Sequence, residues 1–389
     1  LEDFGIKEIS LVRPFTASRV VNVYDVMPCY LRLGEGALNY PGFLCNLQPL
    51  GSGSAAAIPN LTVLAVSSRS SRYNKVMDKS GPGASVSLYA EHFHLVVETT
   101  EKNPDMSSTD YFNGIKRIGL YAGIYLAGIA SKSQSFILKE YSLSSDTPGL
   151  PRVAYVCMLA SQQTWDSAEK ILYGDNLSDF LPTILHPNEF FEGAIVEPNF
   201  NLGIDTYTFM NHPVIKGLYE RHGREINFAG VVACVAHVTY LKRERSVQMT
   251  VNLVKNILKA DLAILTKVGG GIPESDVMLA VDGLENLGVG TCVILWSHLG
   301  DGTIKDLLTA YSVKADAMVN VGINDEWITL CEQKEVLGGT SVGPFSDDPK
   351  DKPQPADSEI QVRYRDICGA INQFGASRVC LKEIGYEGR

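Results

Sequence analysis

The chain lacks any apolar run long enough to cross a membrane. The nearest, residues 118–130, is shorter than the roughly 18–20 apolar residues that a bilayer helix needs, so we expect it within a buried helix. Residues 1–25 also lack a signal-peptide pattern. These absences argue against a membrane partner and predict a cytoplasmic protein.

The sequence has no excess of positive charge and no paired cysteines. Its formal net charge is −10, which argues against nucleic acid as a partner. Its eight cysteines are spread singly, without a CxxC pair. This pattern favours free thiols in a reducing compartment over a disulfide framework.

Motifs for phosphate-bearing cofactors are missing as well. The triplet Gly269, Gly270 and Gly271 has neither the spacing of a dinucleotide fingerprint nor the Lys-Ser/Thr of a P-loop. The sequence therefore gives little support for a nucleotide cofactor.

The glycine triplet lies instead inside a βαβ pattern. Residues 262–266 and 291–296 are apolar runs of strand length, and a segment of helical periodicity with Pro273 near its start joins them. Such a crossover makes the strands parallel, and ligands bind beyond the carboxyl ends of parallel strands. We therefore predict that the Lys267–Asp276 loop binds substrate through its three glycines and Glu274. The alternative is a tight turn without a ligand.

The order of strand and helix patterns predicts an α/β fold in three parts. Residues 1–145 are β-rich, with one long helix expected over 110–131. Residues 146–337 alternate strands with helices, which predicts a doubly wound, mostly parallel, Rossmann-like sheet. Residues 338–389 are expected to form a linker and a C-terminal helix over 358–372.

Two histidines alternate on a strand predicted over residues 91–98. His92 and His94 then point to one face, which Glu98 shares. Two histidines and a carboxylate are a common ligand set, so a metal site is one hypothesis. A polar strand face without a metal is the other.

A polar loop, Asn199–Asn211, follows a short strand predicted at Ala194–Val196. Loops held by a rigid scaffold often carry function, and this one is dense in Asn, Asp, Thr and Tyr. If its strand belongs to the sheet that carries the glycine loop, both loops emerge at the same edge and substrate sits between them. The alternative is a plain crossover loop.

Six stretches, taken together and in order, resemble the proprotein subunit of component B of the glycine, sarcosine and betaine reductase complexes. They span nearly the whole chain, so the series is more specific than any single motif. The stretches are VRPFTASRVVNVYDVMP (12–28), DKSGPGAS (78–85), PRVAYVCMLASQ (151–162), LPTILHPNEFFEGAIV (181–196), HPVIKGLYERHGREINFAGVV (212–232) and GGGIPESD (269–276).

In that family, the chain cleaves itself at an internal Cys, and the new N-terminus becomes a pyruvoyl group that takes the substrate amine as a Schiff base. A second subunit carries the selenocysteine or Cys that attacks the substrate carbon. The resemblance therefore implies a small-molecule substrate, a thiol- or selenol-bearing partner subunit and a hetero-oligomer. Within the stretch DKSGPGAS we assign Ser80 and Gly81 to substrate binding.

This chain departs from the family at the cleavage position. The family's Cys should lie between Val196 and Tyr207, where this sequence reads EPNFNLGIDTY, without Cys or Ser. Self-cleavage needs a side-chain nucleophile at the scissile bond, and Thr206 is the only hydroxyl candidate, in a context that does not match. We therefore predict that the chain stays whole, without a pyruvoyl group or other cofactor.

The resulting hypothesis is a non-pyruvoyl homologue of the component B proprotein subunit. In a complex with its partner, it would serve reductive or thiol-dependent cleavage of a C–N or related C–X bond in a small amino or carboxylate substrate. We predict Asp205 and Tyr207 as catalytic residues, and Asn199 and Asn201 as further substrate-binding residues. The alternatives are a non-catalytic scaffold or binding subunit, and a metal-dependent enzyme that uses His92 and His94.

Overall fold

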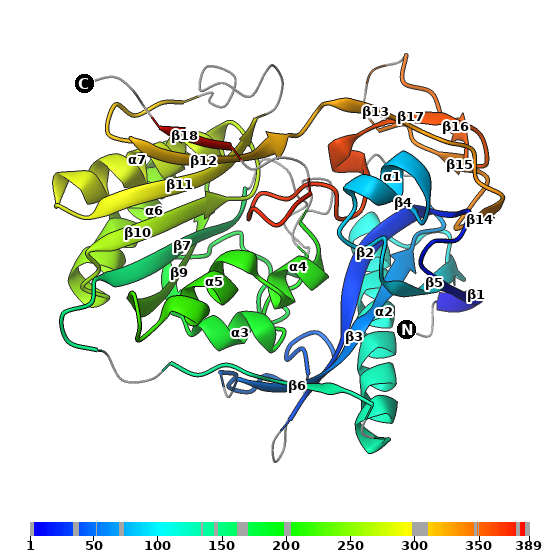
Figure 1. Ribbon diagram of the computed structural model, residues 1–389, viewed down its shortest axis with the longest axis horizontal. Helices are drawn as coiled ribbons and strands as arrows, with labels where there is room; N and C mark the ends of the chain where they lie inside the picture. The colour runs from blue at the N-terminus through cyan, green and yellow to red at the C-terminus, as the bar shows by residue number, and fades with distance from the viewer. Residues whose placement is uncertain are drawn as a thin grey trace.

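The computed structural model confirms an α/β fold with two mixed sheets side by side (Figure 1). It describes residues 4–33, 39–51, 53–69, 74–133, 135–143, 147–161, 170–197, 204–297, 310–345, 348, 350–378 and 382–385. In Figure 1 the first sheet and the N-terminus lie at the right, and the second sheet and the C-terminus at the left.

Within the described residues, the first sheet has seven strands. Five follow the order β1-β5-β3-β2-β14, while β4 pairs with β2 and β6 pairs with β3. The strands are β1 (Phe4–Val12), β2 (Ser18–Arg32), β3 (Ser54–Val66), β4 (Lys75–Asp78), β5 (Phe93–Glu101), β6 (Ile137–Glu140) and β14 (Glu335–Leu337).

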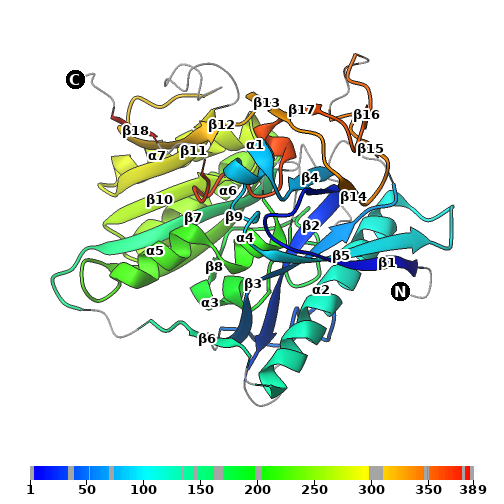
Figure 2. The ribbon, with the colours of Figure 1, turned by 45° about the vertical axis from the view of Figure 1, so that its right-hand side comes forward.

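The long helix predicted over 110–131 is confirmed as α2 (Ser108–Lys132), and it packs on the first sheet through β2 and β3. Its small residues allow a close approach to β2 (Figure 2). A Cβ atom at Gly123 would lie 2.6 Å from the Pro28 carbonyl oxygen, and one at Gly119 would lie 2.6 Å from the Met27 sulfur. The short helix α1 (Gly81–Val86) follows β4 directly.

The second sheet has the order β18-β12-β11-β10-β7-β9-β8 in the described part of the chain. Strands β12, β11, β10, β7 and β9 run parallel, and the edge strands β8 and β18 are antiparallel to their neighbours. The strands are β7 (Arg152–Ser161), β8 (Thr183–Leu185), β9 (Asn227–Ala236), β10 (Leu262–Lys267), β11 (Gly290–Ser297), β12 (Ala317–Ile323) and β18 (Lys382–Gly385).

Helices cover both faces of the second sheet. Strand β7 explains why, because its side chains alternate between two apolar clusters. Tyr155 and Cys157 pack with α3 (Pro187–Phe191), α4 (Thr206–Met210) and α5 (Pro213–Arg221), and Val156 and Met158 pack with α6 (Tyr240–Asn252) and α7 (Ile272–Asn286). A π-helical turn, Leu253–Ile257, continues α6.

The βαβ unit is confirmed. Strands β10 and β11 pair in parallel, and α7 joins them, beginning just after the glycine triplet. Gly269 and Gly271 have φ angles of 107° and 73°, a region that favours glycine, so the triplet makes the sharp turn from strand to helix.

Two element predictions were wrong. Residues 358–372 do not form a helix but contain β17 (Ile360–Arg363) and a 3₁₀ turn, Tyr364–Asp366. Ile360 and Val362 alternate inward on a strand that pairs with β13 (Trp327–Leu330), so strand pairing prevails there. Residues 194–196 are not a strand of the parallel sheet, since only an isolated bridge joins Ile195 to Leu172.

The C-terminal part of the chain returns to the first sheet. Strand β14 pairs in parallel with β2, and the hairpin of β15 (Ser341–Val342) and β16 (Gln354–Pro355) follows. The Arg19 guanidinium donates to the carbonyl oxygens of Cys331, Ala356 and Ser358 at 2.7–2.9 Å and forms an ion pair with Asp78. Both side chains of this pair are fully buried.

No helix in the described ranges combines the length and the apolar character that a membrane crossing requires. The segment 118–130 forms the middle of α2, and three of its large apolar side chains, Tyr121, Tyr125 and Ile129, are 51–61% exposed. Its expected burial is therefore correct only for the face that packs on the first sheet.

Candidate functional site

The candidate site lies between the two sheets, at the N-terminal end of α4. Figures 1 and 2 both place α4 between them, and its Met210 sulfur lies 3.0 Å from the hydroxyl of Tyr40. Asp205 is the N-cap of α4 and accepts hydrogen bonds from the backbone N–H and the hydroxyl of Thr208, both at 2.7 Å. An N-cap carboxylate is typical at this position, so the sequence itself favours a helix start here.

Tyr89, from the segment between α1 and β5, reaches across to Asp205. Its hydroxyl donates to Asp205 Oδ1 and Oδ2 at 2.9 and 2.8 Å and lies 3.0 Å from Thr208 Oγ1. Asp205 is 2% exposed, and burial raises the pKa of its carboxyl to about 6. The carboxylate is therefore already satisfied within the protein, which favours a positioning role over direct contact with substrate.

Tyr207 and His92 complete an aromatic group around Tyr89. The ring centroid of Tyr207 lies 5.1 Å from that of Tyr89 and 5.5 Å from that of His92. Burial, followed by the charge of Asp205, raises the pKa of Tyr207 to about 12, so its hydroxyl stays protonated at neutral pH. The Tyr207 hydroxyl has no hydrogen-bond partner among the residues that the structure describes, so it can donate to a bound molecule.

The structure brings His92 and His94 close together, but not on one strand face. His92 lies in the turn before β5, and the ring centroids are 6.4 Å apart. His94 Nδ1 lies 2.6 Å from Thr62 Oγ1, and His94 also interacts with the backbone of Tyr89, whereas the buried atom His92 Nδ1 has no partner in the described ranges. The His92 ring nitrogen Nδ1 is therefore available inside the site.

The same geometry does not complete a metal site. Glu98 lies roughly 13 Å along β5 from His94 and is engaged elsewhere, by Lys7 Nζ and the Gly338 N–H. Among the described residues, no group of three or more His, Cys, Asp or Glu side chains is arranged to hold a metal ion. The expectation that Glu98 shares the face of both histidines was wrong, because His92 precedes the strand.

Lys79 supplies a buried positive charge beside the histidines. Its Nζ donates to the carbonyl oxygens of His92 at 2.6 Å and Tyr89 at 3.4 Å, and no carboxylate in the described part pairs with it. Burial lowers the pKa of Lys79 to about 7. Burial, then the Lys79 charge, lowers the pKa of His92 to about 4, so its ring is neutral at physiological pH.

A second buried carboxyl, Asp25 on β2, holds the other side of α4. Asp25 accepts from the Thr206 N–H at 3.0 Å and from the Thr206 hydroxyl at 2.6 Å. Thr206 Oγ1 also accepts from the Glu197 N–H at 3.0 Å. Burial, together with the neighbouring Asp205, raises the pKa of Asp25 to about 7, although the hydrogen bonds from Thr206 act in the opposite direction. The only Thr between Val196 and Tyr207 is thus buried and fixed by two partners.

The glycine loop forms a separate, internally paired structure. Lys267 Nζ donates to the Gly269 carbonyl oxygen at 2.5 Å and lies 3.0 Å from Glu274 Oε1, and both charged side chains are buried. In the described ranges, no hydrogen bond, ion pair or ring contact joins Gly269, Gly270 or Gly271 to Asp205 or Tyr207. Since residues 194–196 are not a strand of that sheet, the argument that put both loops at one edge fails, and a shared site remains a prediction.

The other predicted binding residues divide into two groups. Ser80 is the N-cap of α1, and its hydroxyl donates to Gln333 Oε1 at 3.1 Å; Gly81 follows with a φ of 71°. Both follow Lys79 in the chain, but the Ser80 hydroxyl contacts Gln333, and a Cβ atom at Gly81 would lie 3.9 Å from Cys331. Asn199 and Asn201 lie outside the described residues.

Sequence reasoning missed Tyr89, Lys79 and Asp25. Tyr89 and Asp205 are 116 residues apart, and no local pattern links them. Lys79 lies inside the turn-forming stretch DKSGPGAS, and Asp25 lies inside the largely apolar stretch VRPFTASRVVNVYDVMP. A charged residue inside such a stretch was the signal in the sequence that could have identified each of them.

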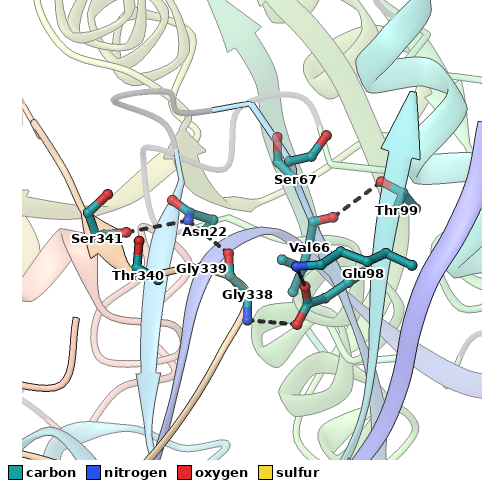
Figure 3. Close-up of a pocket in the computed structure, with 11 residues that line it drawn as sticks. Asn22, Val66, Ser67, Glu98, Thr99, Gly338, Gly339, Thr340 and Ser341 are labelled. Carbon is teal, nitrogen blue, oxygen red and sulfur yellow. Dashed lines mark hydrogen bonds and ion pairs between the residues drawn. The ribbon is translucent and has the colours of Figure 1, made fainter. Parts of the chain in front are cut away.

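A distinct cavity of about 240 Å³ lies at the other end of β5 (Figure 3). Glu98 lines it, with Lys7 Nζ 2.8 Å from one carboxylate oxygen and the Gly338 N–H 2.8 Å from the other. The Asn22 amide, also drawn there, donates to the Gly338 carbonyl oxygen at 2.9 Å. These polar groups pair with one another, so they hold the returning segment 338–341 against the first sheet.

Comparisons with known proteins agree on one family. Residues 2–382 match the family described as glycine/sarcosine/betaine reductase component B subunits. Glycine reductase complex component B subunits alpha and beta of Acetoanaerobium sticklandii is 28% identical, over 96% of this chain and 89% of that protein. Sarcosine reductase complex component B subunit alpha of Peptoclostridium acidaminophilum is 30% identical, over 83% of this chain and 77% of that protein.

No solved structure matches the chain. The match to the family, however, extends over nearly every element described above, from β1 to the start of β18. The chain therefore belongs to the family of glycine/sarcosine/betaine reductase component B subunits.

Proposed function

We propose that this chain is a non-pyruvoyl homologue of the component B proprotein subunit. The observation that carries the proposal is the sequence EPNFNLGIDTY at 197–207, which has no Cys or Ser where the family cleaves itself. Its single Thr is buried, donates to Asp25 and accepts from the Glu197 N–H, so its hydroxyl is held away from a free attacking position.

The chain acts in the cytoplasm as one subunit of a hetero-oligomer. The relatives are named as subunits of reductase complexes, which supports a partner for this chain as well. The partner's thiolate or selenolate attacks the substrate carbon, and the amine leaves with the electron pair and takes up a proton. The reaction class is reductive or thiol-dependent cleavage of a C–N or related C–X bond in a small amino or carboxylate substrate.

The strand order of the second sheet supports the doubly wound arrangement on which this placement depends. From β7 the sheet extends to β9 on one side and to β10, β11 and β12 on the other, so the order reverses beside β7. Ligands in such sheets bind where the order reverses, beyond the carboxyl ends of the strands. The hydroxyl of Tyr155, on β7, lies 3.2 Å from His212 Nε2. This contact links the region beside β7 to the end of α4.

Within the site, the Tyr207 hydroxyl donates a hydrogen bond to the substrate. Asp205 fixes Tyr89 against Tyr207, and the neutral His92 ring offers its Nδ1 atom, which has no partner in the described part of the chain. Buried groups of this kind discriminate strongly between substrates, because a molecule that cannot pair with them leaves them unsatisfied.

Intact-mass measurement tests the loss of self-cleavage. The purified 389-residue chain is expected to give one species at 42.4 kDa. As a control, introducing a nucleophile by Thr206→Cys should also leave the chain whole, because Asp25 and the helix hold that position. Two fragments that meet near residue 200, one with a blocked amino end, would contradict the proposal.

Replacing Tyr207 with phenylalanine should lower turnover by the complex with the partner subunit about 10- to 100-fold, because one hydrogen bond to a polar substrate is lost. The melting temperature should stay unchanged, since the hydroxyl pairs with no described residue. Tyr121→Phe is the matched control, because the Tyr121 side chain is 60% exposed on α2. Equal turnover in both variants would remove Tyr207 from the mechanism and support a scaffold role.

A further inference from the structure

Two lysines from different elements converge at the C-terminal end of α4. Lys139 of β6 and Lys216 of α5 place their Nζ atoms 3.2 and 2.9 Å from the same atom, Asn211 Oδ1. Asn211 is the C-cap of α4, and its Nδ2 donates to the Tyr207 carbonyl oxygen at 3.0 Å. This bond fixes the amide so that its oxygen faces both ammonium groups.

The groups that hold these lysines are neutral. The Tyr30 hydroxyl donates to Asn211 Oδ1 at 2.5 Å and accepts from Lys139, whose Nζ lies 4.6 Å from the centre of the Tyr30 ring. No carboxylate in the described ranges forms an ion pair with Lys139 or Lys216. Glu220, one turn further along α5, acts on Lys216 only at longer range.

Two positive charges that share one neutral acceptor are electrostatically unfavourable. Burial, followed by the charge of Lys139, lowers the pKa of Lys216 to about 7, and Glu220 acts in the opposite direction. Burial lowers the pKa of Lys139 as well. An anion placed between the two ammonium groups would remove the repulsion and supply the missing counter-charge.

We propose that Lys139 and Lys216 form the binding site for the carboxylate group of the substrate. This deepens, and rests on, the proposed function, because Asn211, which both lysines contact, is also bonded to the backbone of the predicted catalytic residue Tyr207. Tyr207 is one helical turn before Asn211, roughly 6 Å along the helix axis. A small amino or hydroxy acid spans that distance, so its carboxylate meets the lysines while its other end meets the Tyr207 hydroxyl.

Binding of acetate to the full chain, measured by calorimetry at constant ionic strength, tests the proposal without turnover. Lys139→Met and Lys216→Met are each expected to weaken acetate binding about tenfold or more. Lys216→Arg should retain most of the affinity, because it keeps the charge. Lys132→Met, at the exposed end of α2, is the matched control and should bind acetate like the unchanged chain. Melting temperatures verify that every variant is folded.

Undetectable acetate binding by the unchanged chain, or equal affinity in the two methionine variants, would overturn the proposal. Inorganic phosphate is the second probe, and tighter binding of phosphate than of acetate would overturn the assignment to a carboxylate. If acetate binding depends on both lysines while the complex with its partner shows no turnover, the site stands and the proposed function fails. If the complex turns over substrate and both methionine variants leave turnover unchanged, the proposed function stands and the carboxylate site fails.

Discussion

Replacing Arg19 with methionine is expected to lower the free energy of unfolding by about 3–5 kcal/mol. The reason is that Arg19 and Asp78 are both fully buried, and their bonds are short, at 2.7 and 2.9 Å. Removing the guanidinium leaves the Asp78 carboxyl and three backbone carbonyl groups without their donor. Chemical denaturation of the two proteins, followed by circular dichroism, measures the difference.

Two further variants separate the buried charge from the loss of packing. Arg221→Met removes an exposed ion pair between the last residue of α5 and Glu225 in the following turn, and should cost about 0.3–0.5 kcal/mol. The double variant Arg19→Met with Asp78→Leu should recover part of the lost stability, because no unpaired charge stays buried. A loss below about 1 kcal/mol for Arg19→Met would show that the pair does not hold the two segments together.

The variant Asp25→Asn is expected to be more stable than the unchanged protein at neutral pH. Burial raises the pKa of the Asp25 carboxyl from its ordinary value of 3.8 to about 7. The folded state then binds more protons than the unfolded state between these values, so stability falls as the pH rises from 4 to 7. The loss for this group is on the order of 4 kcal/mol at most.

Asparagine removes this dependence while it keeps most of the local contacts. Its side-chain oxygen can still accept from the N–H groups of Val26 and Thr206, as Asp25 Oδ1 does. Unfolding free energies should therefore be similar for the two proteins at pH 4, where both side chains are neutral, and should diverge toward pH 7.5. A difference in unfolding free energy that stays constant from about pH 4 to pH 7.5 would show that ionisation of Asp25 does not lower the stability of the protein.

The sequence was sufficient for features that depend on local patterns. The apolar runs of strand length at 262–266 and 291–296, with three glycines before a helix between them, predicted the βαβ unit, which is confirmed. Long-range pairing was less accessible. Ile360 and Val362 form a strand because β13 lies beside them, and among the described residues only an isolated bridge to Leu172 pairs with residues 194–196.

The candidate site shows the same limit. Tyr207, His92 and His94 were selected from separate segments, and the structure brings them into one group. What joins them is Tyr89, whose contact with Asp205 depends on how the first sheet packs against α4. Burial also sets the charge states, because the exclusion of water shifts the pKa values of Lys79 and Asp25, and the sequence alone does not show which side chains are buried.

The bonds of Arg19 also set an order of events on the ribosome. Its carbonyl acceptors in Cys331, Ala356 and Ser358 lie 312, 337 and 339 residues later in the chain. At translation rates of about 5–20 residues per second, β2 waits roughly 15 s to a minute for these partners and for β14. The sheet whose synthesis begins first is therefore completed almost last, while β7 to β11 can fold as soon as they emerge. During this interval the edge of β2 that later pairs with β14 stays open, and an open strand edge is prone to pair with other chains.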